Sequence, residues 1–198
     1  MKASEIPTLE TARLRLRGLR GGDYEDYAAL YADPEVVRFS SDGMTWDRAR
    51  AWRHMAFAVG HWKLNGFGAW LAEEKATGAF LGMIGFWEPA AWPGFELSWH
   101  LAPRYWGMGY ASEGARAALA HAFFVWRRDH VMSLIYAPNL RSIRVAESIG
   151  ERLEGRIDHL GREMLTYGIN RETYLQAVAR TWLPKPAPRR TSGSITPT

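Results

Sequence analysis

The chain has 198 residues, of which 47% are hydrophobic and 23% charged, and it carries a net charge of +4. This length suits one domain with its own core, and the balance is typical of a soluble globular protein. The lack of cysteine excludes disulfides, cysteine nucleophiles and thiolate metal ligands. It is compatible with the cytoplasmic location that we expect. No apolar run approaches the roughly 20 residues of a membrane-spanning helix.

The net positive charge favours an anionic ligand, but the basic residues are scattered rather than gathered on one face. Arg189 and Arg190 form the best basic cluster, within a segment rich in Pro and Ser. No element interleaves basic and aromatic residues as nucleic-acid-binding surfaces do. We therefore expect no nucleic-acid partner, no membrane partner and no bound metal. A polyphosphate ligand would suit the charge.

The first half of the chain predicts a strand, helical segments and three further strands. Alternating apolar and charged residues at 11–19 indicate the first strand. Asp23 is a good N-cap for the first helix, and Thr45 is the expected cap of a longer helix over residues 46–64. Strand-like runs follow at residues 67–72, 79–87 and 95–101.

The second half opens with a clear helix, because apolar residues recur at helical spacing from Ala115 to Trp126. Asn139 begins a shorter helix that Gly150 closes. The remaining predicted elements are strands at residues 130–136, 152–158 and 163–170 and a helix at residues 171–180.

A strand, a helix and another strand in succession imply a right-handed crossover, so at least one pair of strands is parallel. We expect a mixed sheet with helices on both faces, in the α/β or α+β class. One domain is predicted over residues 9–182. Residues 1–8 are predicted to be an N-terminal extension, and residues 183–198 a disordered tail.

The most informative segment is residues 101–111, where a strand ends, Gly107 and Gly109 follow, and a helix begins at once. Amides at a helix N-terminus favour phosphate, and glycines let a phosphate approach the backbone. A P-loop would need Lys and then Ser or Thr where Tyr110 and Ala111 stand, and a dinucleotide fingerprint would need glycine in place of Ser112. An ordinary strand-to-helix turn that uses two glycines is the remaining alternative.

The spacing Arg104-x-x-Gly107-x-Gly109 resembles the pyrophosphate loop of the GNAT N-acetyltransferases. Several flanking segments resemble the RimJ/RimL-like branch of that family, in the right order between about residues 9 and 175: residues 9–17, 82–85, 96–103, 137–150 and 167–169. The resemblance implies the GNAT fold, a central, mixed, mostly antiparallel twisted sheet of about seven strands flanked by helices. It also implies that the fourth and fifth strands, which contain Trp99 and Leu134, splay apart.

The resemblance further implies that acetyl-CoA is the co-substrate, with its pantetheine arm in the gap between those two strands. Backbone groups from Trp99 to Leu101 would pair with pantetheine amides as an added strand does. Amides between Tyr105 and Tyr110 would hold the pyrophosphate. The residues expected to bind the coenzyme are Trp99, His100, Leu101, Arg104, Tyr105, Trp106, Gly107, Met108, Gly109, Tyr110, Ala111, Asn139 and Ser142.

An amine attacks a thioester only when it is neutral, so the enzyme needs a base for the ammonium proton and an acid for the leaving thiolate. Glu96 is the candidate base, acting directly or through water, although it could instead be a sheet-edge charge paired with an arginine. His100 shares its strand face and comes second. Ser142 is the candidate acid, because Ala146 stands where many family members have a tyrosine; its hydroxyl could also simply bond its own helix. The family usually has an aromatic residue where Glu151 stands.

The expected acceptor is a primary amine, on a protein N-terminus or a small molecule, which attacks directly in a ternary complex. A non-catalytic acyl-CoA-binding or regulatory module is the alternative. Fold does not fix the acceptor, and a monomer or a homodimer is equally expected. Two sets of residues are candidates for acceptor contacts: carboxylates that could bind a cation or merely be solvated (Asp42, Asp47, Glu88, Asp158), and tryptophans near loops (Trp46, Trp87, Trp92).

Overall fold

The computed structural model describes residues 6–40, 42–159 and 161–182 and contains one sheet of eight strands in the order β1-β2-β3-β4-β5-β6-β8-β7. All neighbouring strands are antiparallel except β5 and β6, which are parallel. The expected mixed, mostly antiparallel GNAT sheet is confirmed. The strands are β1 (Leu9–Glu10), β2 (Leu14–Arg17), β3 (Ala69–Glu74), β4 (Phe80–Trp87), β5 (Glu96–Leu101), β6 (His130–Tyr136), β7 (Arg152–His159) and β8 (Arg162–Asn170).

The sheet has one strand more than the sequence predicts. The alternation at residues 11–19 was expected to form a single strand, but the structure divides this region. The two-residue β1 pairs with β2 through a tight connection, in which the Thr11 amide donates to the Leu14 carbonyl at 2.9 Å. A strand this short carries too little periodicity to be recognised in sequence.

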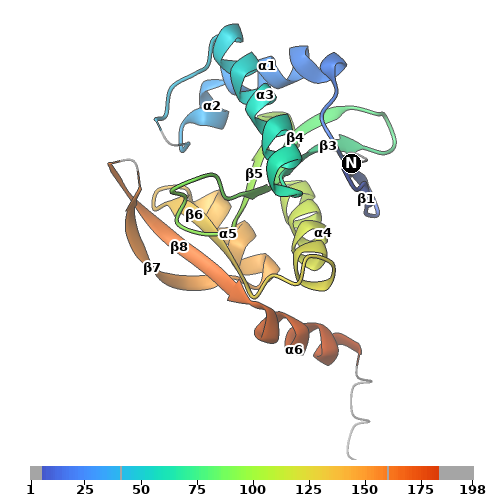
Figure 1. Ribbon diagram of the computed structural model, residues 1–198, viewed down its shortest axis with the longest axis vertical. Helices are drawn as coiled ribbons and strands as arrows, with labels where there is room; N and C mark the ends of the chain where they lie inside the picture. The colour runs from blue at the N-terminus through green and yellow to red at the C-terminus, as the bar shows by residue number, and fades with distance from the viewer. Residues whose placement is uncertain (1–5, 41, 160, 183–198) are drawn as a thin grey trace, which may run out of the picture.

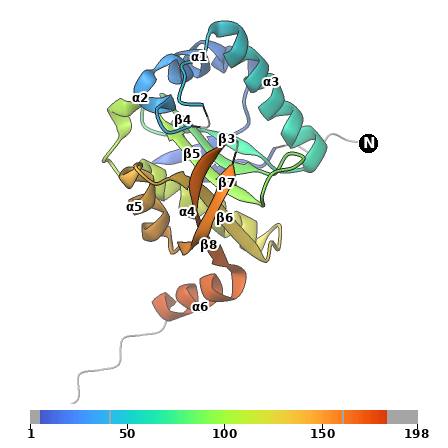
Figure 2. The same ribbon diagram turned by 90° about the vertical axis from the view of Figure 1, so that its left-hand side faces the viewer.

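Helices cover both faces of the sheet (Figures 1 and 2). On one face, α1 (Tyr24–Ala32), α2 (Pro34–Val37) and α3 (Arg48–Asn65) share a core with Leu71 and Met83. On the other, α4 (Tyr110–Phe124) packs Ala115, Leu119 and Phe123 against strand residues. The short 3-10 turns are η1 (Gly21–Asp23) and η2 (Pro103–Tyr105); the remaining helices are α5 (Leu140–Ile149) and α6 (Arg171–Trp182).

Two predicted helix caps differ from the structure. Asp47, not Thr45, caps α3, because its carboxylate accepts from the Arg50 amide at 2.6 Å. Asp23 does stand at the N-cap of α1, but its side chain does not cap that helix. Its carboxylate instead forms a largely buried ion pair with Arg17 and is therefore not free to cap the helix.

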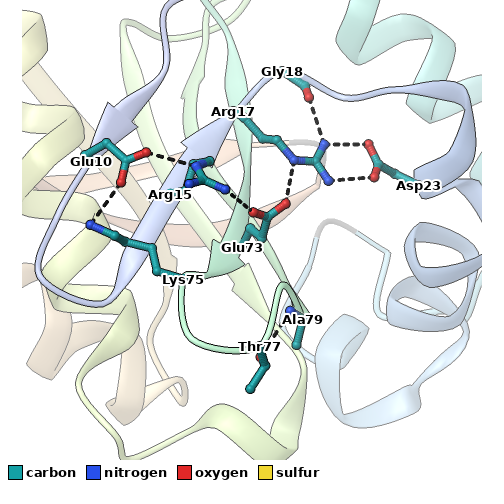
Figure 3. A network of polar contacts seen from close by, with 9 residues as sticks. All are labelled: Glu10, Arg15, Arg17, Gly18, Asp23, Glu73, Lys75, Thr77 and Ala79. Atoms are coloured by element: carbon teal, nitrogen blue, oxygen red, sulfur yellow. Dashed lines mark hydrogen bonds and ion pairs between the residues drawn. The ribbon is translucent and has the colours of Figure 1, made fainter.

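Ion pairs connect the N-terminal strands to one another (Figure 3). The Arg17 guanidinium binds both Asp23 oxygens, at 2.9 and 2.8 Å, and its Nε donates to Glu73 at 2.8 Å. Arg15 joins Glu10 and Glu73 at 2.9 and 2.8 Å. Because Arg17 and both of its partners are largely buried, this network fixes η1 against β2 and β3.

The sheet splits between β5 and β6, the strands that contain Trp99 and Leu134. The two strands share one paired position, Glu96 opposite Met132, whereas β4 and β5 share six. Just beyond that pair, the Ser133 hydroxyl on β6 donates to the Leu97 carbonyl on β5 at 2.8 Å. The predicted splay is therefore confirmed, and a side chain replaces the backbone ladder at its start.

The predicted extension, residues 1–8, and tail, residues 183–198, lie largely or wholly outside the described residues, so those boundaries stay predictions. None of the helices in the described part of the chain combines the length and the apolar character that a membrane span requires.

Candidate active site

A cavity of about 650 Å³ occupies the split between β5 and β6. One part is formed by the glycine loop, residues 103–112, and the first turns of α5. Another part is formed by side chains from α1, α3 and the end of β4. The cavity thus connects the predicted phosphate-binding backbone to a second part that is lined by aromatic side chains.

Most of the predicted site residues line this cavity. They are Glu96, Trp99, His100, Leu101, Tyr105, Trp106, Gly107, Gly109, Tyr110, Ala111, Asn139 and Ser142. Arg104 and Met108 are not among the lining residues. The Arg104 guanidinium lies over the Tyr105 ring, 4.8 Å from its centroid, and the Met108 side chain is 54% exposed.

The glycine loop has the backbone geometry that its sequence predicts. Gly107 and Gly109 have φ angles of 75° and 81°, in the left-handed region that favours glycine. Gly109 is the N-cap of α4, so the amides of the first helical turn lack acceptors within the helix. These amides and the positive end of the helix dipole favour a phosphate here.

Arg13 fastens the loop from its outer side. Its guanidinium forms an ion pair with Glu113 at 2.7 Å, lies 4.2 Å from the Tyr110 ring centroid and donates to the Met108 carbonyl at 3.0 Å. Since a trans peptide directs its N–H opposite to its carbonyl, the Gly109 amide points away from Arg13. Arg13 therefore holds an amide of the loop in a fixed direction.

Two arginines on α5 were not predicted from the sequence. Arg141 and Arg144 line the cavity, and the Arg141 guanidinium lies 4.7 Å from the Trp106 ring centroid. Asn139 caps this helix, since its side chain accepts from the Ser142 amide at 3.2 Å. Helical spacing then sets both arginines near the loop, a placement that depends on how α5 packs against α4.

Glu96 is buried in the split, and no arginine in the described part of the chain pairs with it. The Trp92 indole donates to its carboxylate at 2.6 Å, and the backbone amide of Leu134 donates from β6. Burial raises the pKa of Glu96 to about 7, against the lowering effect of these two donors. The sheet-edge ion pair that the sequence left open is not what the structure has. A carboxyl group with this pKa exchanges protons near neutrality.

His100 lies in the same cavity but is a weaker base. Burial lowers its pKa to about 4, so the ring is neutral at pH 7. Burial and the neighbouring His100 likewise lower the pKa of His54 to about 4. The Tyr27 hydroxyl and His54 Nδ1 form a hydrogen bond of 2.6 Å. Of the groups in the cavity, Glu96 is the better match to the predicted base.

The Ser142 hydroxyl reaches across the cavity instead of serving only its own helix. Its oxygen accepts from the Trp99 indole on β5 at 3.2 Å. The hydroxyl hydrogen is then available to donate to a group held between β5 and α5. Ala146, one turn further along, is fully buried against Ile135 and Leu165.

Glu151 is a second buried carboxyl group. Its one sign in the sequence is a charged residue where the family that the sequence resembles usually has an aromatic one. Its oxygen Oε1 lies 3.1 Å from the Ser133 hydroxyl, while Oε2 is buried with no hydrogen-bond partner in the described structure. Burial raises the pKa of Glu151 to about 8. Since the single Ser133 hydrogen goes to Leu97, a protonated Glu151 satisfies the serine oxygen as a donor.

The four carboxylates considered for a cationic acceptor lie outside the lining of the cavity. Asp42 pairs with Arg50 at 2.6 Å, and Asp47 caps α3. Glu88 lies 3.5 Å from Arg128, and Asp158 accepts from the Gly161 amide at 3.1 Å. The tryptophans considered for acceptor contacts, Trp46, Trp87 and Trp92, all line it.

Comparisons with known proteins point to one family and one fold. The family model described as an acetyltransferase (GNAT) domain matches residues 13–152. The uncharacterized protein YkkB of Bacillus subtilis is 33% identical over 162 residues, which cover 80% of this chain and 93% of that protein. An acetyltransferase from Agrobacterium tumefaciens aligns with a TM-score of 0.75 and 30% identity, covering 84% of this chain and 95% of that one.

A spermidine N-acetyltransferase from Vibrio cholerae, solved with CoA and spermine, aligns with a TM-score of 0.68. The alignment covers 83% of this chain and 99% of that one, at 17% identity. At this identity the similarity establishes a common fold only.

Proposed function

This chain belongs to the GNAT acetyltransferase family, and on that premise we propose that it transfers acetyl from acetyl-CoA to a primary amine by direct attack in a ternary complex. The observation that carries the proposal is Glu96, a buried carboxyl group with a pKa of about 7 in the same cavity as the glycine loop. A proton acceptor tuned to neutrality is what an ammonium substrate requires.

The residues of the glycine loop and α5 fit the phosphates of the coenzyme. Two glycines at positive φ leave room beside the amides of the first turn of α4. Arg141 and Arg144 supply positive charge to the same cavity. Backbone groups of Trp99 to Leu101, on the open side of β5, are proposed to pair with the pantetheine arm. We extend the phosphate contacts to the Tyr105–Ala111 backbone, with Asn139 and Ser142 beside the thiol end.

Bound acetyl-CoA supplies the activated thioester, and side chains of this protein move the protons. Glu96 takes a proton from the acceptor ammonium, directly or through water, so that the neutral amine can attack. Ser142 is proposed to donate a proton to the departing thiolate, because its oxygen is already occupied by Trp99. The hydrogen bond to the Ser142 oxygen fixes the hydroxyl beside β5.

Finer assignments remain part of the proposal. The motifs at residues 96–103 and 137–150 support the RimJ/RimL-like branch. A cytoplasmic location, residues 9–182 as the domain, and a monomer or homodimer are retained as expectations.

The proposal is tested with the full chain by calorimetry and mass spectrometry. We expect acetyl-CoA to bind, and an amine from a mixed library to gain one acetyl group as CoA is released. Binding with no transfer to any amine would instead favour a non-catalytic acyl-CoA-binding module. An absence of binding would contradict both functions.

A further inference from the structure

The acceptor half of the cavity is lined by an aromatic wall, defined as Tyr31, Trp46, His54, Phe57 and Trp87. These residues come from α1, the segment before α3, α3 itself and the end of β4. Tyr31 and Trp46 are stacked, with centroids 4.1 Å apart and planes 9° apart. Phe57 and Trp87 are stacked at 5.5 Å and 8°. His54 lies between the two pairs, 4.6 Å from Trp46 and 5.5 Å from Trp87.

The rings of the wall pack against one another. Each ring is fixed by another ring, and His54 is also held by the Tyr27 hydroxyl. Fixed aromatic rings contribute contact area with little loss of side-chain entropy on binding. The wall is therefore suited to a flat apolar group.

Among the described residues that line this half of the cavity, the charge is low. The Arg50 guanidinium lies 4.8 Å from the Trp46 ring centroid, but it is paired with Asp42 at 2.6 Å. Burial keeps His54 and His100 neutral at pH 7, with pKa values of about 4. The carboxyl groups that line the cavity are Glu96 and Glu35. Glu35 is exposed and lies 3.9 Å from Arg38. One buried carboxyl group, Glu96, is thus available to an ammonium.

A polyamine is a poor match to this arrangement. Each further ammonium that enters a cavity needs its own carboxylate or water, because burying an unpaired charge is costly. None of the four other candidate carboxylates lines the cavity, and Asp42 is already paired with Arg50 beside Trp46. One carboxyl group beside a wall of rings selects a molecule with one cationic end and one aromatic body.

We propose that the acceptor is a primary amine attached through a short linker to an aromatic or fused-ring body. Its ammonium faces Glu96, and its rings contact the aromatic wall. The inference rests on the proposed acetyl transfer and names its substrate class. The new bond joins the amine nitrogen to the acetyl carbon as the carbon–sulfur bond breaks. The nitrogen gives up two protons in this step. One passes from the ammonium to Glu96 before attack, and the second passes through the Ser142 hydroxyl to the departing sulfur, which leaves as the thiol.

A panel of matched amines tests the class. The full chain with acetyl-CoA is given tryptamine, phenethylamine, butylamine and spermidine, and CoA release is followed. We expect kcat/KM for the two aryl amines to exceed that for butylamine and spermidine by about tenfold or more. A dipeptide amide beginning with Trp, compared with one beginning with Gly, asks whether the aromatic amine is presented by a peptide.

The outcomes separate this inference from the function on which it rests. Equal or faster turnover of butylamine or spermidine overturns the aromatic class and leaves acetyl transfer standing. A failure to bind acetyl-CoA overturns the proposed function itself.

Variants of the wall provide the second arm of the test. Trp46→Leu and Trp87→Leu are expected to raise KM for tryptamine about tenfold and to change KM for butylamine much less. Trp52→Leu is the matched control, because Trp52 lies on α3 with 59% of its surface exposed. Butylamine turnover and acetyl-CoA affinity report whether each variant has folded. An equal loss for both amines, or no change for tryptamine, contradicts a role of the wall in acceptor choice.

Discussion

Two buried carboxyl groups at the strand split have different surroundings. Glu96 accepts from Trp92 and Leu134 and opens into the cavity. Glu151 is fully buried and touches Ser133. Burial raises both pKa values, but the two donors to Glu96 favour its charged form more strongly. One group is thus able to act as a base, while the other is held as a neutral hydrogen-bond donor.

The role of Glu96 predicts the pH dependence of the reaction. A base must be unprotonated, so kcat/KM should rise through pH 7 and then level as Glu96 ionises. Glu96→Gln is expected to lower kcat by about 100-fold or more, with acetyl-CoA affinity retained.

Trp92→Phe removes a hydrogen-bond donor that favours the Glu96 carboxylate, so the midpoint of the pH profile should move to higher pH. The surface variant Trp52→Phe is the control, and its midpoint should equal that of the native protein. An unchanged midpoint in Trp92→Phe would argue against Glu96 as the base.

Glu151 predicts an effect on stability with the opposite sign to that of an ordinary surface acid. Its pKa rises from 4.5 to about 8 on folding, so the folded state binds the proton more tightly. Stability is therefore lost as pH rises from about 4.5 to about 8. Glu151→Gln keeps a donor to Ser133 without this loss, and should gain at least about 1 kcal/mol over the native protein between pH 5 and 8. Urea unfolding of both proteins at pH 5 and pH 8 measures this difference in stability. The prediction is contradicted if the free energy of unfolding changes with pH equally in the variant and the native protein.

At the scale of elements, the glycine loop depends on parts of the chain that lie far apart in sequence. Gly107 and Gly109 provide the turn locally, while Arg13, beside β2, fixes the Met108 carbonyl and Glu113. Across the cavity, α5 begins at Asn139 and brings Arg141 and Arg144 to the same space. Two helix N-termini therefore face one anion-binding region.

A matched pair of glycine variants isolates the contribution of the loop. Gly107 and Gly66 have φ angles of 75° and 74°, and an added Cβ would meet no atom within 4 Å at either position. Gly107→Ala and Gly66→Ala should each lose about 1 kcal/mol of unfolding free energy through backbone strain. Only Gly107→Ala should also weaken acetyl-CoA binding, by about tenfold, because its methyl group enters the proposed phosphate site. Equal affinities in calorimetry would show that the phosphates bind elsewhere.

At the scale of the whole molecule, the N-terminal ion-pair network joins three strands to η1. Burial raises the pKa values of Asp23 and Glu73, but hydrogen bonds from Arg17 outweigh it, so both pKa values fall below their ordinary 3.8 and 4.5. These pairs therefore contribute stability above those values, which is lost as pH falls through the folded-state pKa values.

Removal of the central arginine tests this network. Arg17→Met should lower the free energy of unfolding at pH 7 by about 1–3 kcal/mol, because the largely buried Asp23 loses its ion-pair partner and Glu73 keeps only Arg15. The difference between variant and native protein should shrink below pH 4. Arg48→Met, at an exposed pair with Glu25, is the control and should leave stability nearly unchanged. A loss equal in both variants would contradict the importance of burial.

Sequence predicts those features of this molecule that are set locally. Gly107 and Gly109 favour a turn regardless of the rest of the fold, and the order of strands and helices follows from the periodicity of apolar residues. Glu96 could be placed beside the split, but its contact with Trp92 and the resulting pKa depend on tertiary packing. Asp42 and Glu88 were plausible acceptor carboxylates until Arg50 and Arg128 were found beside them. The bond from Ser133 to Leu97, and hence the role of Glu151, joins segments that no local pattern relates.

The single paired position between β5 and β6 has a consequence for heat resistance. Beyond the Met132 amide, which donates to Phe95, the two strands are joined through the side chains of Ser133 and Glu96 and not by a continuous backbone ladder. A coenzyme lying there would finish the sheet, so its occupancy should raise the melting temperature in proportion to the logarithm of its concentration. Saturation at 100 times the dissociation constant corresponds to about 2.7 kcal/mol, which scanning fluorimetry resolves. Bound coenzyme would thus stabilise the folded protein as well as supply the acetyl group.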